Sequence, residues 1–339
     1  MTRRPRRARL AVLGLGRMGS VHAANLARAC PSAELIACYD RDPDVARAAA
    51  ERYGAVAVPS VEDLLGIEGL DGLVIAAPTA AHAPLALAAA EAGLGTFVEK
   101  PIALDRRSTL QVVERFEAAR LALQVGFNRR FDESVADVHR RVRAGELGPP
   151  YFLRISQRDM APPRPEFLAG SGGIFLDMGI HDFDLARFLV GDVARVSAVG
   201  AALADPGLRD IGDFDTAVAT LEFANGALGV VDLGRAAGYG YESSAELVGA
   251  TATVRLETPP ALAAEWLRAG EATRPLLRSY DRRYGPAFAA ELEAFARALL
   301  DGTPVPVTGR DALAAFEVAL AATRSCALGR PVSLDEVVE

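Results

Sequence analysis

Apolar runs short enough to be buried strands alternate with helical stretches over the first third of the chain. We expect strands at residues 10–13, 34–39, 56–58, 73–77, 96–99 and 121–125, and helices from the glycine turn at 14–19 to about 29, from 61, from 80 and over 108–119. Strands that alternate with helices pair in parallel, because each helix returns the chain to the same edge of the sheet. The pattern predicts an α/β fold with a doubly wound parallel sheet, whose ligands bind beyond the carboxyl ends of the strands.

Beyond about residue 126 the pattern changes to strands with few helices between them. A helix over 133–143 and a strand over 151–157 come first, and further strands are expected at 193–203, 215–224, 227–235, 243–249 and 252–257. Asn225-Gly226 between two of these strands is a typical two-residue hairpin turn. This part predicts an α+β domain with a mostly antiparallel, open-faced sheet, closed by helices near 286–300 and 310–328.

The length of the chain predicts two domains. At 339 residues it exceeds the size at which one hydrophobic core keeps growing, so we expect one domain over 1–126 and a second over 127–339. One face of the second sheet would lie on helices, and the other face could bury against another subunit. We therefore expect a homo-oligomer, either a dimer or a tetramer.

The stretch 172–191, GGIFLDMGIHDFDLARFLVG, places ionisable groups in an apolar helix. Asp177 and His181 are four residues apart and would lie on one face of that helix, with Asp184 three residues further on. The paired glycines at its start permit a tight turn where a ligand or another backbone comes close. His181 could equally be a core histidine that pairs with a neighbouring acid. A metal site is less favoured, because no other histidine has a recognised ligand spacing with it.

The charge of the chain argues against nucleic acid as a partner. The net charge is −7 and the sequence pI is about 5.3. A basic arm at the N-terminus is the local exception, and it contains Arg3, Arg4, Arg6, Arg7 and Arg9. No amphipathic helix accompanies this arm, so residues 1–8 are expected to be a disordered lead-in rather than a transit peptide.

Residues 72–90 carry no charged side chain, yet they do not predict a membrane span. Pro78, Thr79, His82 and Pro84 interrupt the run, which favours a buried strand, a loop and a helix. The three cysteines have no metal or redox spacing, and we see no signal-peptide pattern. We therefore expect no membrane partner and a location in the reducing cytoplasm.

Lysine occurs once in this sequence. Of the 37 basic residues, the only lysine is Lys100, and all others are arginine. In a chain that uses arginine almost everywhere, a single lysine indicates a site that needs a compact ammonium group with three rotatable donors. Chance survival of a surface lysine is the alternative. The position favours a functional role, because Lys100 directly follows a probable buried strand.

The turn after the first strand has the glycine pattern of a dinucleotide-binding Rossmann domain. It consists of Gly14, Leu15, Gly16, Arg17, Met18 and Gly19, and it opens a helix. The glycines allow a tight turn and let a pyrophosphate approach the helix N-terminus. The next strand ends in Asp40, whose carboxylate can accept hydrogen bonds from the adenine ribose hydroxyls.

The residue at the end of the second strand also bears on the choice of cofactor. A carboxylate at Asp40 would repel the 2′-phosphate of NADP, so NAD is favoured. Arg41 keeps NADP as the alternative, because an arginine beside the ribose can accommodate that phosphate.

Several further residues stand at the carboxyl ends of predicted strands or just beyond them. They are Ala77, Pro78, Thr79, His82, Glu99 and Lys100. Because ligands bind at these ends in a doubly wound sheet, we expect this set to lie next to the cofactor. His82 could equally be a helix-surface residue, and it is given no chemical role.

Three separated motifs together resemble the Gfo/Idh/MocA family of nicotinamide-dependent sugar and polyol oxidoreductases, over essentially the whole chain. They are the glycine turn, Glu99-Lys100-Pro101 and GGIFLDMGIHDFD. Finer features resemble the inositol 2-dehydrogenase branch of that family, namely GFNRRFD from Gly126, SGGIF from Ser171, IGDFD from Ile211 and Tyr239-Gly240-Tyr241. The resemblance implies an NAD-dependent dehydrogenase that oxidises a cyclic polyol, with myo-inositol as the favoured substrate.

The resemblance implies catalytic roles that elementary chemistry supports. Oxidising a secondary alcohol requires that the hydroxyl proton be removed while hydride leaves, and a histidine suits that step. His181 is the expected general base, and Asp177 would orient it and stabilise the imidazolium. Lys100 would hydrogen-bond the reacting oxygen and stabilise its developing negative charge.

A polyol with many hydroxyls also needs many polar partners. The family pattern implies that Arg129, Asp159 and Tyr241 lie near the substrate, and also Asn128, Gln157 and Asp184. Asn128 and Asp159 differ from the residues common at these positions in inositol dehydrogenases. The preferred polyol is therefore left open, whereas the type of reaction is not affected.

Three other functions stay open from the sequence. A member of the same family could act on scyllo-inositol, glucose or another sugar. A nucleotide- or sugar-sensing protein could have kept the fold and lost the chemistry, although a sensor needs no base such as His181. A lysine Schiff-base enzyme that uses Lys100 is the third alternative.

Overall fold

The computed structural model describes residues 6–338 of the chain. The chain divides into two compact units: Met1–Phe131 with Pro286–Leu313, and Asp132–Gly285 with Ala314–Glu339. The positions of these units relative to one another are not determined.

The first unit contains six strands and most of the helices of the N-terminal part. Its strands are β1 (Ala8–Leu13), β2 (Ala33–Tyr39), β3 (Val56–Ala57), β4 (Gly72–Ile75), β5 (Gly95–Val98) and β6 (Leu123–Val125). Its helices are α1 (Arg17–Arg28), α2 (Pro43–Tyr53), α3 (Val61–Leu65), α4 (Thr79–Glu91), α5 (Arg106–Ala119) and the 3-10 helix η1 (Asn128–Phe131). The strands pair in parallel in the order β3-β2-β1-β4-β5-β6, which confirms the predicted doubly wound parallel sheet.

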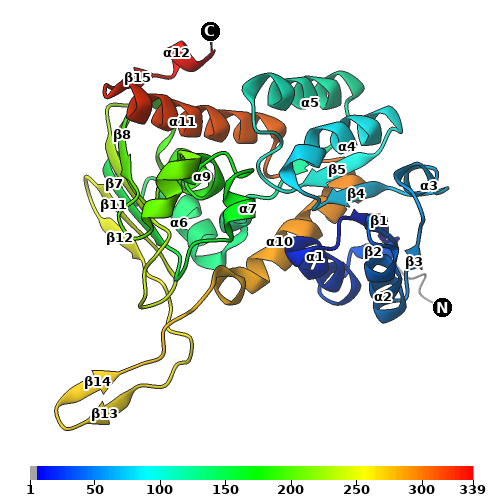
Figure 1. The fold of residues 1–339 in the computed structure, drawn as a ribbon, viewed down its shortest axis with the longest axis horizontal. Coiled ribbons are helices and arrows are strands. Elements are labelled where there is room, and N and C mark those ends of the chain that lie inside the picture. The colour runs from blue at the N-terminus through cyan, green and yellow to red at the C-terminus, as the bar shows by residue number, and fades with distance from the viewer. Residues whose placement is uncertain (1–5, 339) are drawn as a thin grey trace. The chain divides into compact units, whose positions relative to one another are not determined.

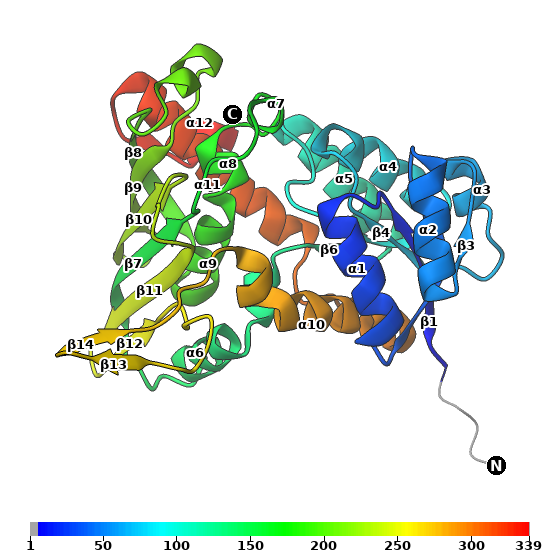
Figure 2. The ribbon, with the colours of Figure 1, turned by 60° about the horizontal axis from the view of Figure 1, so that its bottom comes forward.

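Helices cover both faces of this sheet. Helices α1 and α2 lie on one face, and α4 and α5 lie on the other (Figures 1 and 2). Capping residues set the ends of α2: the carboxylate of Asp42 accepts a hydrogen bond from the N–H of Asp44 at 2.9 Å, Pro43 is the first helical residue, and Gly54 ends the helix with φ of 71°.

One late segment groups with the first unit, unlike the expected boundary between residues 126 and 127. Residues 286–313 belong here because Leu292 and Phe295 of α10 (Tyr280–Asp301) share a hydrophobic core with Leu10 of β1. The division falls within α10. The second unit is therefore not one continuous stretch of chain, because residues 286–313 lie between its two parts in the sequence.

The second unit is built on a seven-stranded mixed sheet. Its strands are β7 (Pro150–Arg158), β8 (Val193–Ala201), β9 (Thr216–Phe223), β10 (Leu228–Gly234), β11 (Glu242–Gly249), β12 (Thr253–Leu256) and β15 (Val332–Ser333), in the order β12-β11-β7-β10-β9-β8-β15. Only β7 and β10 pair in parallel, so the prediction of a mostly antiparallel sheet is confirmed.

The helices of the second unit are short except for α11, across which the division of the chain also falls. They are α6 (Glu133–Arg143), α7 (Pro165–Leu168), α8 (Ile174–Asp177), α9 (Ile180–Val190), the 3-10 helix η2 (Pro206–Ile211), α11 (Gly309–Leu328) and α12 (Asp335–Val338). Helices α6 and α9 lie on one face of the sheet (Figure 1). A separate hairpin of β13 (Trp266–Arg268) and β14 (Glu271–Thr273) extends away from that sheet.

The predicted hairpin at Asn225-Gly226 forms, but its connection is longer than two residues. Strand β9 ends at Phe223 and β10 begins at Leu228. The N–H of Gly226 donates to the carbonyl oxygen of Phe223 at 2.9 Å. The N–H of Phe223 donates to the carbonyl oxygen of Ala227 at 2.9 Å. These two bonds close the turn before the ladder begins.

The stretch from 172 to 191 is not the single helix that its apolar pattern predicts. Helix α8 ends at Asp177, and α9 starts only after Gly179. A side chain at Gly179 would collide, because an added Cβ would lie 2.9 Å from the carbonyl oxygen of Phe175 and 2.9 Å from Cδ1 of Leu233. The prediction that Asp177 and His181 share one continuous helix face is therefore wrong.

The N-terminal arm falls partly outside the described residues, since the structure describes the chain only from Arg6. Strand β1 already includes Ala8. The guanidinium of Arg6 pairs with Asp71 at 2.6 Å. Between residues 6 and 338, no helix combines the length and the apolar character that crossing a membrane requires.

Candidate active site

The glycine turn between β1 and α1 has the geometry that a dinucleotide needs. Gly14 has φ of +87°, and an added Cβ would lie 2.7 Å from the backbone N of Ala77. At Gly19 an added Cβ would lie 1.8 Å from the carbonyl oxygen of Gly14, so both positions admit only glycine. Gly16 faces open space and starts α1 without a side-chain cap. A helix start of this kind can receive a phosphate group.

The carboxylate of Asp40 is fixed beside this turn. One oxygen accepts a hydrogen bond from the N–H of Leu15 at 2.7 Å, and the other accepts one from the N–H of Asp42 at 2.9 Å. A carboxylate oxygen can accept more than one hydrogen bond, so Asp40 can still accept ribose hydroxyls. Arg41, the next residue, is exposed.

The loops after β4 and β5 are tied together by His82. Its ring is 2 % exposed, and its two nitrogens lie 2.7 Å from the carbonyl oxygen of Ala77 and 2.8 Å from that of Pro101. The alternative of a helix-surface position is therefore wrong for this histidine. In the loop after β4, Pro78 is the N-cap residue of α4 and Thr79 is the first residue of that helix. Lys100 follows β5, is half-buried and precedes a cis peptide bond to Pro101.

Three polar residues meet at one edge of the second sheet. Asp159 directly follows β7, Arg235 directly follows β10, and Tyr241 directly precedes β11. Since Arg158 pairs with Gly234 on one side and with Glu242 on the other, these three residues stand at the same edge of adjacent strands.

Asp177 joins this edge through Arg235. The guanidinium of Arg235 is 1 % exposed and lies 3.3 Å from an oxygen of Asp177 and 3.3 Å from an oxygen of Asp213. Two carboxylates thus share one buried cation. The other oxygen of Asp213 accepts the N–H of Ile174 at 2.9 Å, and Ile174 begins α8, the helix that ends at Asp177. Arg235 and Asp213 therefore fix both ends of the segment that carries Asp177.

His181 stands near the start of α9, as its second residue. Its side chain is half-buried, whereas Asp184 on the same helix is 1 % exposed. Asp184 therefore lies within the unit and not on its surface.

The other predicted substrate residues are buried in their own units. Asn128 and Arg129 lie in η1 and are 4 % and 3 % exposed. Gln157 in β7 is 6 % exposed, and Tyr241 is 3 % exposed.

Three buried residues were missed by sequence reasoning, and a fourth, Asp213, was noted only as part of the IGDFD motif. Arg235, Asp213, His22 and Glu291 are all buried and charged or polar. The signal for Arg235 was an arginine that directly follows an alternating strand, and the abundance of arginine in this chain conceals it. His22 and Glu291 stand on apolar helix faces far apart in sequence, and nothing local connects them.

Two family models match the chain. Residues 8–127 match the oxidoreductase family with an NAD-binding Rossmann fold, and residues 135–255 match the GFO/IDH/MocA C-terminal domain. The predicted NAD-binding fold is thereby confirmed.

Similar proteins extend over nearly the whole chain. The scyllo-inositol 2-dehydrogenase (NAD(+)) of Bacillus subtilis (strain 168) is 37% identical and covers 96% of each chain. The myo-inositol 2-dehydrogenase of Thermotoga maritima is also 37% identical, over 97% of this chain and 99% of that one. The solved structure of a scyllo-inositol dehydrogenase from Lactobacillus casei, with bound NAD(H) and scyllo-inositol, has a TM-score of 0.91 at 28% identity and covers 97% of this chain and 100% of that one.

Proposed function

Because the chain belongs to the GFO/IDH/MocA family of oxidoreductases, we propose that it oxidises a secondary alcohol of a cyclic polyol with NAD, most specifically myo-inositol to its 2-ketone. The observation that carries this proposal is the 37% identity to inositol 2-dehydrogenases over nearly the full length of both chains. Scyllo-inositol is the second candidate, since one of those relatives is named for it. Oxidation of either inositol at this carbon gives the same ketone, so the two substrates differ only in the face that loses hydride.

The cofactor fits the residues of the first unit. The uncapped start of α1 at Gly16 would hold the pyrophosphate, and Asp40 would hold the adenine ribose. With NAD held there, the cofactor would supply the acceptor for the hydride from the carbinol carbon.

Three side chains are proposed to remove the proton of the reacting hydroxyl and to stabilise the charges that then develop. His181 takes that proton as general base, and a correctly placed base accelerates such a step by about 10²–10⁴-fold. Lys100 donates a hydrogen bond to the oxygen as negative charge develops. Asp177 stabilises the charged His181 imidazole, while Arg235 limits how far its carboxylate can move.

The remaining polar residues are proposed to bind the other hydroxyls of the ring. Asp159 and Tyr241 stand at the sheet edge near Arg235, and Asn128 and Arg129 come from η1. Hydroxyl groups need such partners, because a buried polar group without a hydrogen bond costs free energy.

We propose that the protein assembles as a homo-oligomer, a dimer or a tetramer. Val199 of β8 and Val218 of β9 are cross-strand partners and are 68% and 36% exposed. Trp266 and Leu267 of the separate hairpin are 74% and 76% exposed. Exposed apolar groups of this kind mark interaction surfaces. Sedimentation that gives a monomer at micromolar concentration would contradict the proposal. We also propose that the protein is located in the cytoplasm.

The preference for NAD can be tested at Asp40. In Asp40→Ala the affinity for NAD should fall by about tenfold or more, since a hydrogen bond to a charged group contributes about 1.5–3 kcal/mol, and NADP binding should suffer less. Calorimetric titration with both cofactors measures this. Asp42→Ala is the matched control, because it removes only the cap of α2. Equal losses for NAD and NADP in the Asp40 variant would be evidence against the ribose contact.

The substrate is tested by formation of the reduced cofactor, NADH or NADPH, from myo-inositol, scyllo-inositol and glucose, each with NAD and with NADP. We expect turnover of myo-inositol with NAD. Reduction of the shared ketone adds the second test, because hydride delivered to one face gives myo-inositol and to the other gives scyllo-inositol, and NMR distinguishes them. Scyllo-inositol as the product would move the substrate to the second candidate. Cofactor binding without turnover of any polyol would favour the sensing alternative.

A further inference from the structure

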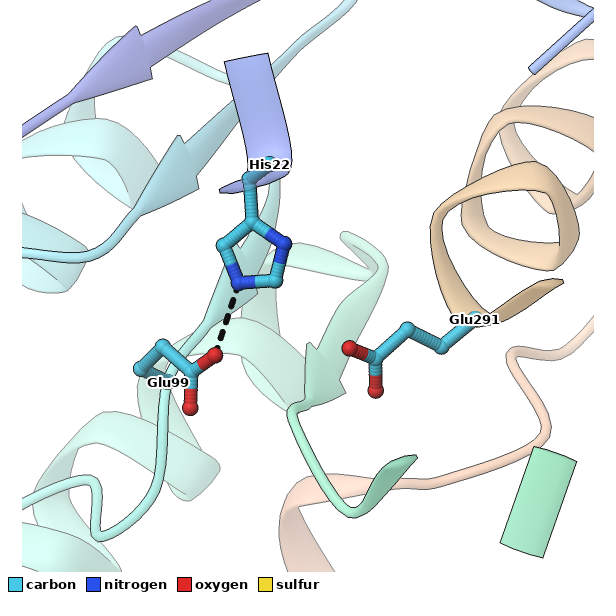
Figure 3. Close-up of side chains that lie close together, drawn as sticks. All are labelled: His22, Glu99 and Glu291. Atoms are coloured by element: carbon cyan, nitrogen blue, oxygen red, sulfur yellow. Dashed lines mark hydrogen bonds and ion pairs between the residues drawn. The ribbon is translucent and has the colours of Figure 1, made fainter. Parts of the chain in front are cut away.

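A buried group of three titratable side chains lies in the first unit (Figure 3). His22 comes from α1, Glu99 follows β5, and Glu291 comes from the part of α10 that belongs to this unit. One nitrogen or oxygen atom of each lies within 4.8 Å of those of the other two. His22 and Glu291 are 0% exposed, and Glu99 is 9% exposed.

The surroundings of these three residues are largely apolar. The ring of Phe97 meets the His22 ring edge-on at 5.3 Å, and that of Phe288 at 6.2 Å. Gln124 donates to the backbone carbonyl of Glu291 at 2.7 Å, not to its side chain. Two ionised carboxylates in such surroundings would be strongly unfavourable.

The hydrogen bonds in the group are unequally distributed. Nε2 of His22 lies 2.7 Å from one oxygen of Glu99, and the other oxygen of Glu99 accepts the backbone N–H of Lys100 at 3.3 Å. Among the described residues, neither carboxyl oxygen of Glu291 has a hydrogen-bond partner, nor has Nδ1 of His22. Figure 3 shows the carboxyl group of Glu291 directed toward the other two side chains.

The electrostatics distinguish the two acids. Burial and the nearby charge of Glu99 raise the pKa of Glu291 well above its usual range. Burial acts to raise the pKa of Glu99 as well, but the hydrogen bond from His22 and the nearby charge of Lys100 hold it below its usual value. Burial is the main reason that the pKa of the Cys30 thiol is raised to about 12, and the nearby acids Glu293 and Glu291 raise it further. This thiol therefore stays neutral.

A metal ion explains this arrangement less well than a proton does. Both oxygens of Glu99 and Nε2 of His22 are already engaged. A cation bound without breaking those bonds would be left with Nδ1 of His22 and Glu291, fewer protein ligands than structural metal sites use. A proton on Glu291 removes one negative charge and supplies a donor that can face Nδ1.

We propose that Glu291 is a neutral carboxylic acid that positions Lys100 through His22 and Glu99. The O–H faces Nδ1 of His22 and favours the tautomer in which Nε2 carries the proton and donates to Glu99. Glu99 in turn holds the backbone N–H of Lys100. The positioning of Lys100 rests on its role in the proposed function, whereas the protonation of Glu291 does not.

The protonation is tested by thermal unfolding of wild type, Glu291→Gln and Glu293→Gln between about pH 5 and about pH 8, without substrate. In the unfolded chain Glu291 ionises at an ordinary glutamate pKa near 4.5, whereas in the folded chain it keeps its proton, so wild-type stability falls as the pH rises. The amide in the Glu291→Gln variant has no such proton to hold. The unfolding midpoint of this variant minus that of wild type should therefore increase with pH.

Glu293 on the same helix is the matched control. Its pKa is lowered, with burial opposing the hydrogen bonds from Ser32 and Arg297 that lower it. It is therefore ionised in the folded and the unfolded chain over most of this range, and its variant should differ from wild type by a constant amount. A constant difference for Glu291→Gln as well would overturn the proposal.

The positioning is tested by turnover. Glutamine keeps a neutral donor of the same shape, so Glu291→Gln should retain most of kcat/KM, whereas Glu291→Leu should lose about tenfold to a hundredfold, the cost of a displacement on the order of 1 Å. Equal losses in both variants would contradict the proposal, as would stoichiometric metal in the wild type that Glu291→Gln lacks. If no polyol is oxidised at all, the proposed function fails, while the unfolding series still decides whether Glu291 is protonated.

Discussion

Replacing His181 by alanine should lower the turnover of the polyol by about two to four orders of magnitude, because the reaction then loses its proposed general base. The affinity for NAD should stay close to that of the wild type, since the glycine turn and Asp40 belong to the other unit. Steady-state kinetics and calorimetric titration of NAD measure the two effects separately.

His139→Ala is a suitable control for this experiment. The ring of His139 on α6 stacks on Phe188 of α9 at 3.7 Å, so its loss disturbs the packing of the helix that carries His181 without removing that histidine. His139→Ala should lower turnover much less than His181→Ala does. If His181→Ala keeps full turnover, His181 is not the base. If both variants lose activity equally, the loss in His181→Ala comes from disturbed packing of α9 and not from removal of a base.

Replacing Arg235 by methionine should lower the free energy of unfolding by roughly 3–5 kcal/mol, since it leaves Asp213 buried without its cation. Asp213 is 4% exposed, so solvent cannot replace the lost partner. Turnover should fall as well, because Asp177 loses the same contact. Urea unfolding followed by far-UV circular dichroism measures the stability.

The second sheet provides a matched comparison for Arg235. Arg195 of β8 pairs with Glu222 of β9 at 2.6 Å, but both side chains are about half exposed. Arg195→Met should therefore change the free energy of unfolding by no more than about 1 kcal/mol. Similar small changes in both variants would mean that Arg235 is not an essential part of the second unit.

The sequence predicted those parts of the fold that depend on local patterns. The alternation of apolar runs and helical stretches predicts the parallel sheet, and the glycine turn with Asp40 predicts the dinucleotide site, because both follow from spacing along the chain. Helix α6 has the predicted bounds, Glu133–Arg143. Its start is marked by Asp132, whose carboxylate accepts the N–H of Val135 at 3.2 Å.

The remaining features depend on contacts between distant segments. Gly179 stands at the break before α9, where an added Cβ would lie 2.9 Å from Cδ1 of Leu233, and Leu233 comes from a strand that follows much later in the chain. The environment of Asp177 is likewise set by Arg235, which no local pattern connects to it. The apolar spacing of 172–191 therefore predicts helix, but it does not contain the information that interrupts it.

In the proposed reaction, hydride passes from a ring carbon of the polyol to NAD. Myo-inositol that carries deuterium at the oxidised carbon, incubated with the protein and unlabelled NAD, tests this most directly, with mass spectrometry of the reduced cofactor as the measurement. We expect each molecule of NADH to contain a single deuterium. NADH without deuterium, or ketone formed without NADH, would contradict the assignment of this protein as an NAD-dependent polyol dehydrogenase.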